Sequence, residues 1–193
     1  MKILIGSNNI GKIKEYRNLL GPRFNLISLH ELDLELDVEE TGRTYAENAL
    51  IKLNALKDKS NIPILTDDSG LEVRALGDKP GIFSARYSGK NATDKSNVDK
   101  LIKELSNSSD FSAKFVCTIA FFDPKNKLSE VVCTGECKGD IILERRGNSG
   151  FGYDPIFYIK ELDKTFAELS EDEKNLISHR AIAVKELLKR INI

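Results

Sequence analysis

Short apolar runs alternate with amphipathic segments along the first part of the chain. Residues 2–5 are mainly apolar and predict a strand, and residues 13–20 repeat apolar side chains with helical spacing until Gly21 and Pro22 end the pattern. Residues 24–29 predict a second strand. A second amphipathic pattern begins at Thr44 and continues to about residue 59. This part of the chain therefore predicts two strands and two helices in alternation.

A third strand is predicted at residues 62–65, and polar residues follow it. Asp67, Asp68 and Ser69 come where this apolar run would end, and ligands often bind beyond the carboxyl ends of strands. Two adjacent carboxylates repel each other unless a cation lies beside them, and a divalent ion with oxygen ligands is the simplest candidate. The alternative is a polar turn between two strands.

The second half of the chain predicts further strands and two helices. Thr93 and Asp94 can cap a helix that ends near Leu105, and the apolar inner face of this helix indicates a scaffold role. Ser170 and Glu173 form a capping box that opens a single terminal helix reaching Ile191. The expected strands are residues 113–122 and 127–136, which predict a long hairpin, and the shorter residues 139–143; a short apolar run follows at residues 156–159.

Length and charge limit the classes of function. A chain of 193 residues fits one domain, which we expect to span residues 1–193. Lys and Arg total 29, Asp and Glu total 30, and the net charge of −1 gives no electrostatic reason to expect binding of long nucleic acids. A small anion needs only a local positive pocket and stays possible.

The cysteines and the apolar runs indicate the compartment. Cys117 and Cys133 lie in apolar runs, and together with Cys137 they form no Cys-x-x-Cys pair, so we expect reduced thiols in the cytoplasm. No apolar run approaches the roughly 18 residues of a membrane span, and residues 2–5 enter a strand without a signal-peptide pattern. We therefore expect no membrane partner.

A glycine-rich segment between the first strand and the first helix is a candidate phosphate site. Its spacing from Gly6 to Lys12 is that of a P-loop, but residue 13 is Ile where a P-loop needs Ser or Thr to hold magnesium. Backbone N–H groups, the helix dipole and Lys12 can still bind phosphates, while other residues must hold the metal. The alternative is an ordinary turn.

Three further groups of residues are candidates for binding. Lys52 lies one helical turn after Asn48 and is either functional or simply exposed, whereas Glu47 is assigned to capping with Thr44. In the glycine-rich loop at residues 146–155, Phe151 either stacks on a base or anchors the loop in the core. Polar side chains in the first half of the terminal helix either donate hydrogen bonds to a carbonyl or phosphate or face solvent; they are Lys174, Ser178, His179 and Arg180.

Taken together, these segments resemble the inosine triphosphate pyrophosphatase family, also called dITP/XTP pyrophosphatases. Six motifs carry the resemblance, in the family's order and from end to end of the chain. They are Ser7-Asn-Asn-Ile-Gly-Lys12, Glu40-Thr-Gly-Arg-Thr-Tyr-Ala-Glu-Asn-Ala49 with Lys52, Asp67-Asp-Ser-Gly-Leu71, Pro80-Gly-Ile-Phe-Ser-Ala-Arg-Tyr87, Gly150-Phe-Gly-Tyr-Asp-Pro155 and Ser178-His-Arg180.

The resemblance implies a fold and an activity. The fold is α/β, with an elongated, curved mixed sheet flanked by helices in two lobes and a central cleft, usually in a homodimer. The activity is magnesium-dependent hydrolysis of non-standard purine nucleoside triphosphates (ITP, dITP and XTP) to the monophosphate and pyrophosphate, which cleanses the nucleotide pool. A Maf-like pyrophosphatase of other specificity and a non-catalytic nucleotide-binding module are the alternatives.

The resemblance also implies roles for individual residues. Glu40 and Asp68 resemble the metal ligands, and Asp68, Lys52 and Asp67 the catalytic residues. His179 and Arg180 would donate hydrogen bonds to the 6-carbonyl of inosine or xanthosine, whereas the amino group of adenine would leave a donor facing a donor. The implied substrate-binding residues are Ser7, Asn8, Asn9, Ile10, Gly11, Lys12, Ser69, Phe151, Gly152, Tyr153, Asp154, Lys174, His179 and Arg180.

Overall fold

The computed structural model describes residues 1–125 and 130–191. The chain divides into two compact units, and each is built from separate stretches of sequence. Unit 1 comprises Met1–Asp68, Cys117–Gly135 and His179–Ile193, and unit 2 comprises Ser69–Val116 and Glu136–Ser178. That the whole chain forms a single domain stays a prediction.

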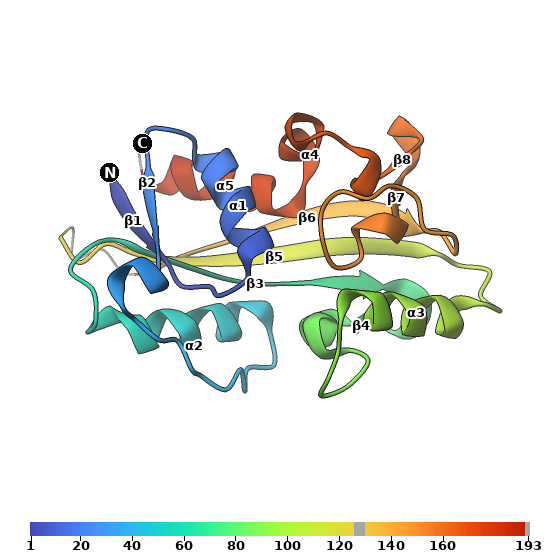
Figure 1. The fold of residues 1–193 in the computed structure, drawn as a ribbon, viewed down its shortest axis with the longest axis horizontal. Helices are drawn as coiled ribbons and strands as arrows, with labels where there is room; N and C mark the ends of the chain where they lie inside the picture. The colour runs from blue at the N-terminus through green and yellow to red at the C-terminus, as the bar shows by residue number, and fades with distance from the viewer. Residues whose placement is uncertain (126–129, 192–193) are drawn as a thin grey trace. The chain divides into compact units, whose positions relative to one another are not determined.

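Unit 1 has parallel strands between two layers of helices. Strand β1 (Lys2–Ile5) pairs in parallel with β2 (Asn25–Ser28) and with β3 (Ile64–Val73). Helices α1 (Ile10–Leu20) and α5 (His179–Arg190) lie on one face, and α2 (Tyr45–Lys57) lies on the other (Figure 1). Strands covered on both faces are apolar throughout, which is why the continuous apolar run at residues 2–5 predicted this strand correctly.

The packing of unit 1 follows the two-residue period of its strands. Ile3 and Ile5 pack in one cluster with Tyr16 of α1 and Leu187 of α5. Leu4, which points the other way, packs in a second cluster with side chains of α2 and β3; these are Ala49, Leu53, Leu56 and Ile64. Alternate residues of one strand therefore belong to different cores.

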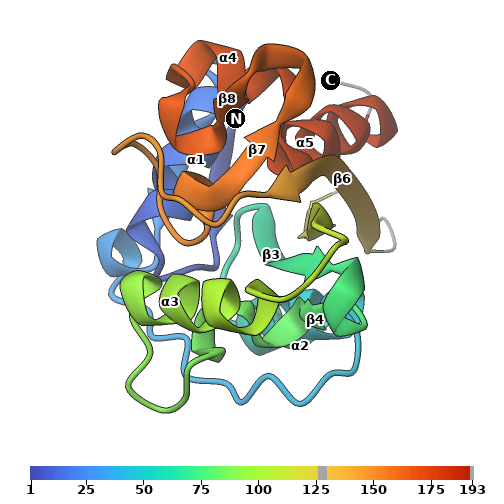
Figure 2. The ribbon, with the colours of Figure 1, turned by 90° about the vertical axis from the view of Figure 1, so that its right-hand side faces the viewer.

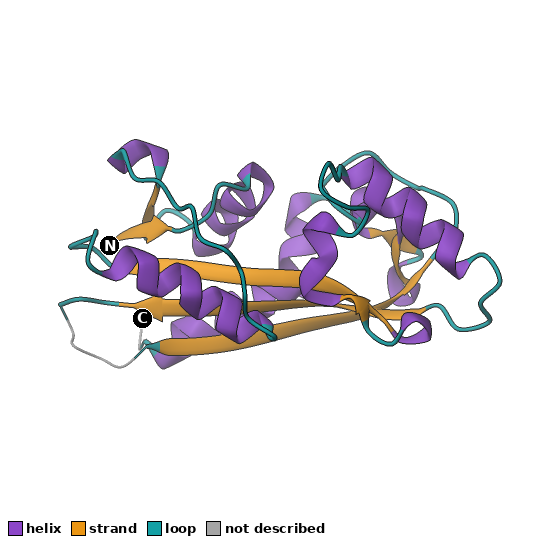
Figure 3. Cartoon of the chain, turned by 90° about the horizontal axis from the view of Figure 1, so that it is seen from below, coloured by secondary structure: helices purple, strands orange, loops and turns teal. Residues whose placement is uncertain are grey.

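Three long strands contribute residues to both units. They are β3, β5 (Ser112–Phe122) and β6 (Val131–Ile141). Within the described residues the sheet has eight strands in the order β2-β1-β3-β5-β6-β7-β8, with β4 paired to β3. Helices flank these strands (Figure 3). The predicted α/β class, a mixed sheet flanked by helices, is confirmed.

Unit 2 adds short strands and helices around an aromatic core. Its remaining strands are β4 (Lys79–Pro80), β7 (Phe157–Ile159) and β8 (Lys164–Thr165), and its helices are α3 (Asp94–Leu105) and α4 (Glu171–Ile177); α3 is green in Figure 2. The 3₁₀ turns among the described residues of both units are η1 (His30–Leu32), η2 (Arg74–Leu76), η3 (Gly81–Arg86), η4 (Asp154–Ile156), η5 (Lys160–Leu162) and η6 (Phe166–Glu168).

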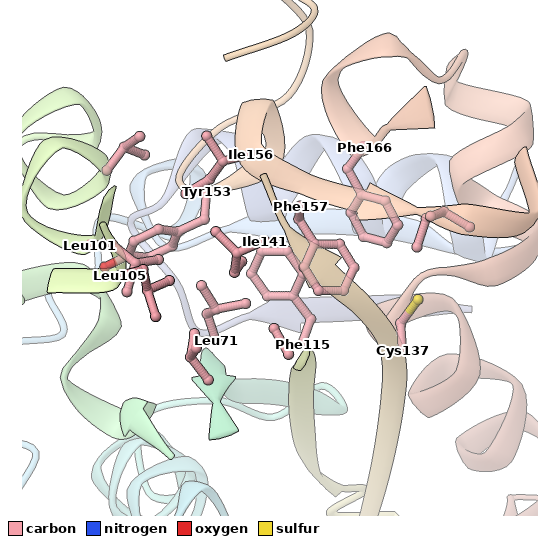
Figure 4. Packing of buried hydrophobic residues seen from close by; sticks show 14 of the residues in the cluster. Leu71, Leu101, Leu105, Phe115, Cys137, Ile141, Tyr153, Ile156, Phe157 and Phe166 are labelled. Atoms are coloured by element: carbon pink, nitrogen blue, oxygen red, sulfur yellow. The ribbon is translucent and has the colours of Figure 1, made fainter. Parts of the chain in front are cut away.

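Three phenylalanines lie together in the core of unit 2 (Figure 4). The ring centroids of Phe115 and Phe157 are 4.6 Å apart, and those of Phe157 and Phe166 are 4.8 Å apart in an edge-to-face arrangement. Such pairs contribute about 0.5–1.5 kcal/mol beyond the burial of their area. This cluster joins β5 to β7 and to the 3₁₀ turn η6, beside the glycine-rich loop that precedes β7.

Two of the predicted strand boundaries are wrong. Strand β3 does not end at the aspartates but continues through them to Val73, because Leu71 and Val73 are buried and continue its apolar pattern. The separate strand expected at residues 139–143 is the continuation of β6, which ends at Ile141. The expected start of the preceding strand, at residues 127–129, lies outside the described residues.

The single terminal helix predicted from Ser170 to Ile191 is also wrong. The capping box of Ser170 and Glu173 is present, but α4 ends at Ile177 and Ser178 has an extended conformation with ψ 152°. A new helix, α5, then begins at His179. The apolar residues of the two successive helices have the spacing of one continuous helix, so the pattern did not indicate the break between them.

No helix in residues 1–125 or 130–191 is long and apolar enough to cross a membrane.

A glycine in β6 allows α5 to pack directly on the sheet. A Cβ atom added at Gly135 would lie 2.2 Å from the carbonyl oxygen of His179 and 2.4 Å from the backbone nitrogen of Ala183. We predict that Gly135→Ala lowers the free energy of unfolding by about 1–3 kcal/mol, because overpacked backbone must shift. Urea denaturation measures this loss. Lys185→Ala on the exposed face of α5 is the control, and an equal stability of both variants would contradict the prediction.

Candidate active site

The two adjacent aspartates of β3 face different helices. Strand residues alternate between the two faces of a sheet. Thr66 donates a hydrogen bond to the carbonyl oxygen of Ala49 in α2, and Asp68 accepts one from Asn48 Nδ2 of the same helix at 2.9 Å. Asp67 instead contacts Lys12 of α1 and Arg180 of α5. Helices on opposite faces therefore give the two carboxylates different partners.

Asp67 is a buried anion between two cations. Its side chain is 1% exposed, its Oδ2 lies 3.0 Å from Lys12 Nζ, and Arg180 Nε is 3.7 Å away. Burial raises the pKa of Asp67, but Lys12, Arg180 and Lys52 outweigh it and lower the pKa to about 2. Asp67 therefore stays ionised at neutral pH.

Asp68 has the opposite electrostatic environment. Burial raises its pKa above the ordinary value for aspartate, and the nearby Glu40 adds to this, although Lys52 and the hydrogen bond from Asn48 act against it. A carboxylate with a raised pKa is a better proton acceptor than an ordinary aspartate. Of the two aspartates, Asp68 is therefore the one suited to general base catalysis.

Lys52 and Glu40 form an ion pair beside the aspartates. Lys52 Nζ donates to Glu40 Oε1 at 2.8 Å. Burial lowers the pKa of Lys52, yet the carboxylates of Asp67, Glu40 and Asp68 raise it overall, so the ammonium group stays charged. The interpretation of Lys52 as an ordinary exposed lysine is wrong, because the side chain is buried.

The loop before α1 is held by local hydrogen bonds of Ser7 and Asn9. Asn9 caps the helix, and its Oδ1 accepts from the backbone nitrogen of Lys12 at 3.0 Å. Ser7 Oγ accepts from the nitrogen of Asn9. Ile10 is 82% exposed at the first helical position. The helix N-terminus therefore presents its backbone donors together with Lys12.

Arg180 and its neighbours form a buried layer behind Asp67. The guanidinium is 1% exposed and makes an ion pair with Glu15 of α1. The thiol of Cys117 lies 3.8 Å from Asp67 Oδ2 and 3.6 Å from the hydroxyl of Tyr16. Burial raises the pKa of the Cys117 thiol to about 12, so it stays protonated and can donate to Asp67.

Sequence reasoning found some of these residues and missed others. It noted Asn48 because this residue lies one turn from Lys52, but gave it no role. It missed Glu15, whose position on an amphipathic helix resembles any solvated glutamate. Tyr16 was assigned only to the apolar face of its helix, and Cys117 only to the core.

In unit 2, the glycine-rich loop holds a second group of the predicted residues. Asp154 Oδ2 accepts from the backbone nitrogen of Phe151 at 2.9 Å and from Lys174 Nζ at 2.6 Å. The Lys174 ammonium also lies 5.5 Å from the centre of the Phe151 ring. Tyr153 is buried in the core, and its hydroxyl donates to the carbonyl of Ser84. Tyr153 thus anchors the loop, while Phe151 is half-buried.

The predicted site residues therefore fall into two groups. Unit 1 brings together five of them in direct contacts or a shared electrostatic environment: Lys12, Glu40, Lys52, Asp67 and Asp68, with Arg180 and His179 at the start of α5. Unit 2 brings together Phe151, Asp154 and Lys174. Within the described residues, no three His, Cys, Asp or Glu side chains form a group that could hold a metal ion by themselves.

The chain is a member of the Ham1 family. The model of that family matches residues 3–190. The resemblance found in the six sequence motifs is confirmed, and so is the prediction that the protein is an enzyme of this kind.

The relatives are bacterial proteins of nearly equal length. A dITP/XTP pyrophosphatase of Staphylococcus aureus is 45% identical over 186 residues, which cover 96% of this chain and 94% of the relative. One from Bacillus cereus is 44% identical over 195 residues, covering 98% and 94%. The solved structure of the Staphylococcus aureus Ham1 protein matches with a TM-score of 0.87 and 44% identity, covering 100% of this chain and 98% of that one.

The two aspartates should affect stability in opposite ways. The ionised form of Asp67 is favoured by folding, since its pKa is lowered, so Asp67→Asn should cost about 2–4 kcal/mol at pH 7. The ionised form of Asp68 is disfavoured, since its pKa is raised, so Asp68→Asn should leave the stability unchanged or increase it. Urea denaturation of both variants measures the difference, and equal losses would contradict these assignments.

Proposed function

We propose that this protein hydrolyses non-standard purine nucleoside triphosphates, namely ITP, dITP and XTP. Water attacks the α-phosphorus, and the products are the nucleoside monophosphate and pyrophosphate. The observation that carries the proposal is the charged cluster of unit 1, where a carboxylate with a raised pKa, Asp68, lies beside a lysine that stays protonated, Lys52. The relatives are named dITP/XTP pyrophosphatases, which supports dITP and XTP as substrates.

The triphosphate binds to the N-terminus of α1 and to two lysines. Backbone N–H groups at the N-terminus of α1 and the helix dipole favour an anion there. Lys12 and Lys52 neutralise the charge that grows on the leaving pyrophosphate. Both side chains are already held in place by carboxylates, Lys12 by Asp67 and Lys52 by Glu40. Their positions therefore need little reorganisation when the substrate arrives.

The donor set fits a magnesium ion. Magnesium is usually bound through one or two carboxylates, several waters and the oxygens of substrate phosphates, so a pair of carboxylates is sufficient. Glu40 and Asp68 are the proposed ligands, and the contribution of Glu40 to the raised pKa of Asp68 supports placing both carboxylates in one charged cluster. When bound, the ion would polarise the phosphate and lower the pKa of the attacking water.

Asp68 accepts the proton of the attacking water. Its raised pKa suits a general base, and Asn48 fixes the carboxylate by a 2.9 Å hydrogen bond. Asp67 has a different role in the proposal. Because it stays ionised between Lys12 and Arg180, it holds these cations in place, and its contact with the metal is not needed.

The purine base is proposed to stack on Phe151 and to be recognised by hydrogen-bond donors. His179 and Arg180 are the donors assigned to the 6-carbonyl, which adenine lacks, and a donor left facing the adenine amino group would cost about 1–3 kcal/mol. Arg180 is deeply buried and forms an ion pair with Glu15. Direct contact with a base therefore requires the ion pair to separate, or a guanidinium nitrogen other than the one paired with Glu15 to point toward the base.

We further propose that the enzyme acts as a homodimer. We also propose that it is located in the cytoplasm and that its two units form one ITPase-like domain. The three cysteines are free and buried, as suits a reducing compartment. A family model that matches residues 3–190 as one unit supports a single domain.

The products of ITP hydrolysis test the reaction class. We expect IMP and pyrophosphate, resolved by ion exchange, with no orthophosphate as the primary product, because attack at the α-phosphorus keeps the β and γ phosphates together. We also expect a magnesium chelator to abolish turnover and added magnesium to restore it. Primary release of orthophosphate, or full activity in the chelator, would contradict the proposal.

Replacement of Asp68 tests the assignment of the base. Asp68→Asn keeps the size of the side chain and an acceptor for Asn48. It removes the proton acceptor and the negative charge of a proposed metal ligand. We expect kcat for ITP to fall by about 10²–10⁴ in a folded protein. Asp58→Asn, at the end of α2 and exposed, is the matched control. Near-normal activity of Asp68→Asn would assign the base to another residue.

A further inference from the structure

Helix α3 was predicted to be scaffold only, but its first turns make specific contacts with the glycine-rich loop of unit 2. Asp94, the first residue of the helix, accepts a hydrogen bond from the backbone nitrogen of Gly152 at 2.7 Å. Gly152 directly follows Phe151, the residue proposed to stack on the base. A charged acceptor at this distance makes a strong hydrogen bond to a backbone donor.

Two carboxylates thus hold two successive backbone donors of the loop. Asp154, within the loop, accepts from the nitrogen of Phe151, and Asp94, from α3, accepts from the nitrogen of Gly152. The first contact is internal and moves with the loop. The second connects the loop to a helix whose inner face is buried in the core of unit 2. Asp94 therefore fixes the backbone next to Phe151 relative to α3.

A second contact ties the start of the same segment to α3. Arg145 donates to Asp99 Oδ1 at 2.6 Å and to the carbonyl oxygen of Lys95 at 3.4 Å. Residue 145 directly precedes the glycine-rich loop and residue 152 lies within it, and both are attached to the first two turns of one helix. Two separate contacts thus favour one position of the segment relative to α3.

The backbone of the segment needs such contacts. Gly150 and Gly152, on either side of Phe151, have φ angles of +79° and +62°. Glycine gains access to these angles but also has more conformations to lose than any other residue. A phenylalanine between two such glycines is held less by its own backbone than by the bonds that its neighbours make.

We infer that Asp94 is a positioning residue for substrate binding: through the N–H of Gly152 it holds Phe151 in the orientation that receives the purine base. The inference rests on the proposed function of Phe151 and deepens it. Asp94 touches no substrate in this scheme. Its removal weakens binding of the nucleotide, whereas the proton transfer and the phosphate contacts, which depend on Asp68 and the two lysines, are unaffected.

A purely structural role for Asp94 makes a different prediction. An acidic residue in the first turn stabilises its helix through the dipole, and Asp94 would then affect only the stability of α3. Asp172, in the first turn of α4 in the same unit, is a matched control because it is also exposed and acidic. Replacing it removes the same kind of helix-terminal charge without a contact to Gly152.

The experiment compares wild type, Asp94→Ala, Asp94→Asn and Asp172→Ala. For Asp94→Ala we expect KM for ITP to rise about three- to tenfold, the usual effect of a lost charged hydrogen bond at a partly exposed site, with kcat within about twofold. Asp94→Asn keeps an acceptor oxygen and should recover a large part of the KM. Asp172→Ala should match wild type in KM. Hydrogen exchange of the Gly152 amide, followed by NMR, should be faster in Asp94→Ala and not in Asp172→Ala.

The outcomes distinguish a failure of the inference from a failure of the proposed function. An unchanged KM in Asp94→Ala, or equal changes in Asp94→Ala and Asp172→Ala, would overturn the positioning role. If wild type released no pyrophosphate from ITP, the proposed function would be wrong. Gly152 exchange would then decide alone: equal rates in wild type and Asp94→Ala overturn the role of Asp94, and a faster rate in the variant supports it.

Discussion

A buried negative charge in the middle of a strand constrains the rest of unit 1. A carboxylate that is 1% exposed is stable in its ionised form only if cations replace the water it has lost. For Asp67 these cations come from two helices far apart in sequence, Lys12 from α1 and Arg180 from α5. The fold must therefore bring the first turns of both helices to the same face of β3, and Gly135 allows α5 to approach the sheet closely enough.

Local patterns predicted the elements of the fold well where a single rule applied. The apolar run at residues 2–5 was correct because a strand covered on both faces is apolar throughout, and the helical spacing of α1 and α3 was correct because burial of one face fixes the period. The end of β3 was wrong because a charged pair was taken as the end of a strand. Carboxylates can continue a buried strand when their counter-ions come from elsewhere in the chain, and Arg180 lies more than a hundred residues away. Nothing local to the aspartates indicates it.

The same limit applies to the site. The motifs identified the carboxylates and lysines, since these residue types are needed for phosphate chemistry, and the structure brings Lys12, Glu40, Lys52, Asp67 and Asp68 together. The partners of two other predicted site residues, Arg180 and Gly152, were found only in the structure. Glu15 pairs with Arg180 across 165 positions, and Asp94 reaches Gly152 across 58. In the sequence, both look like ordinary acidic residues of a helix. The residues around each of them do not indicate which distant side chain or backbone group it contacts in the folded protein.

The two-residue period of a strand explains how neighbouring aspartates acquire different chemistry. Consecutive side chains point to opposite faces, so Asp67 meets the cations of α1 and α5 while Asp68 meets the amide of α2. The first becomes a permanent anion, and burial leaves the second with a raised pKa. One strand covered by helices on both faces can therefore supply a fixed counter-ion and a proton acceptor from adjacent positions. A turn, in which both side chains are open to water, would leave the two aspartates nearly equivalent, so the continuation of β3 through this pair is itself part of the proposed mechanism.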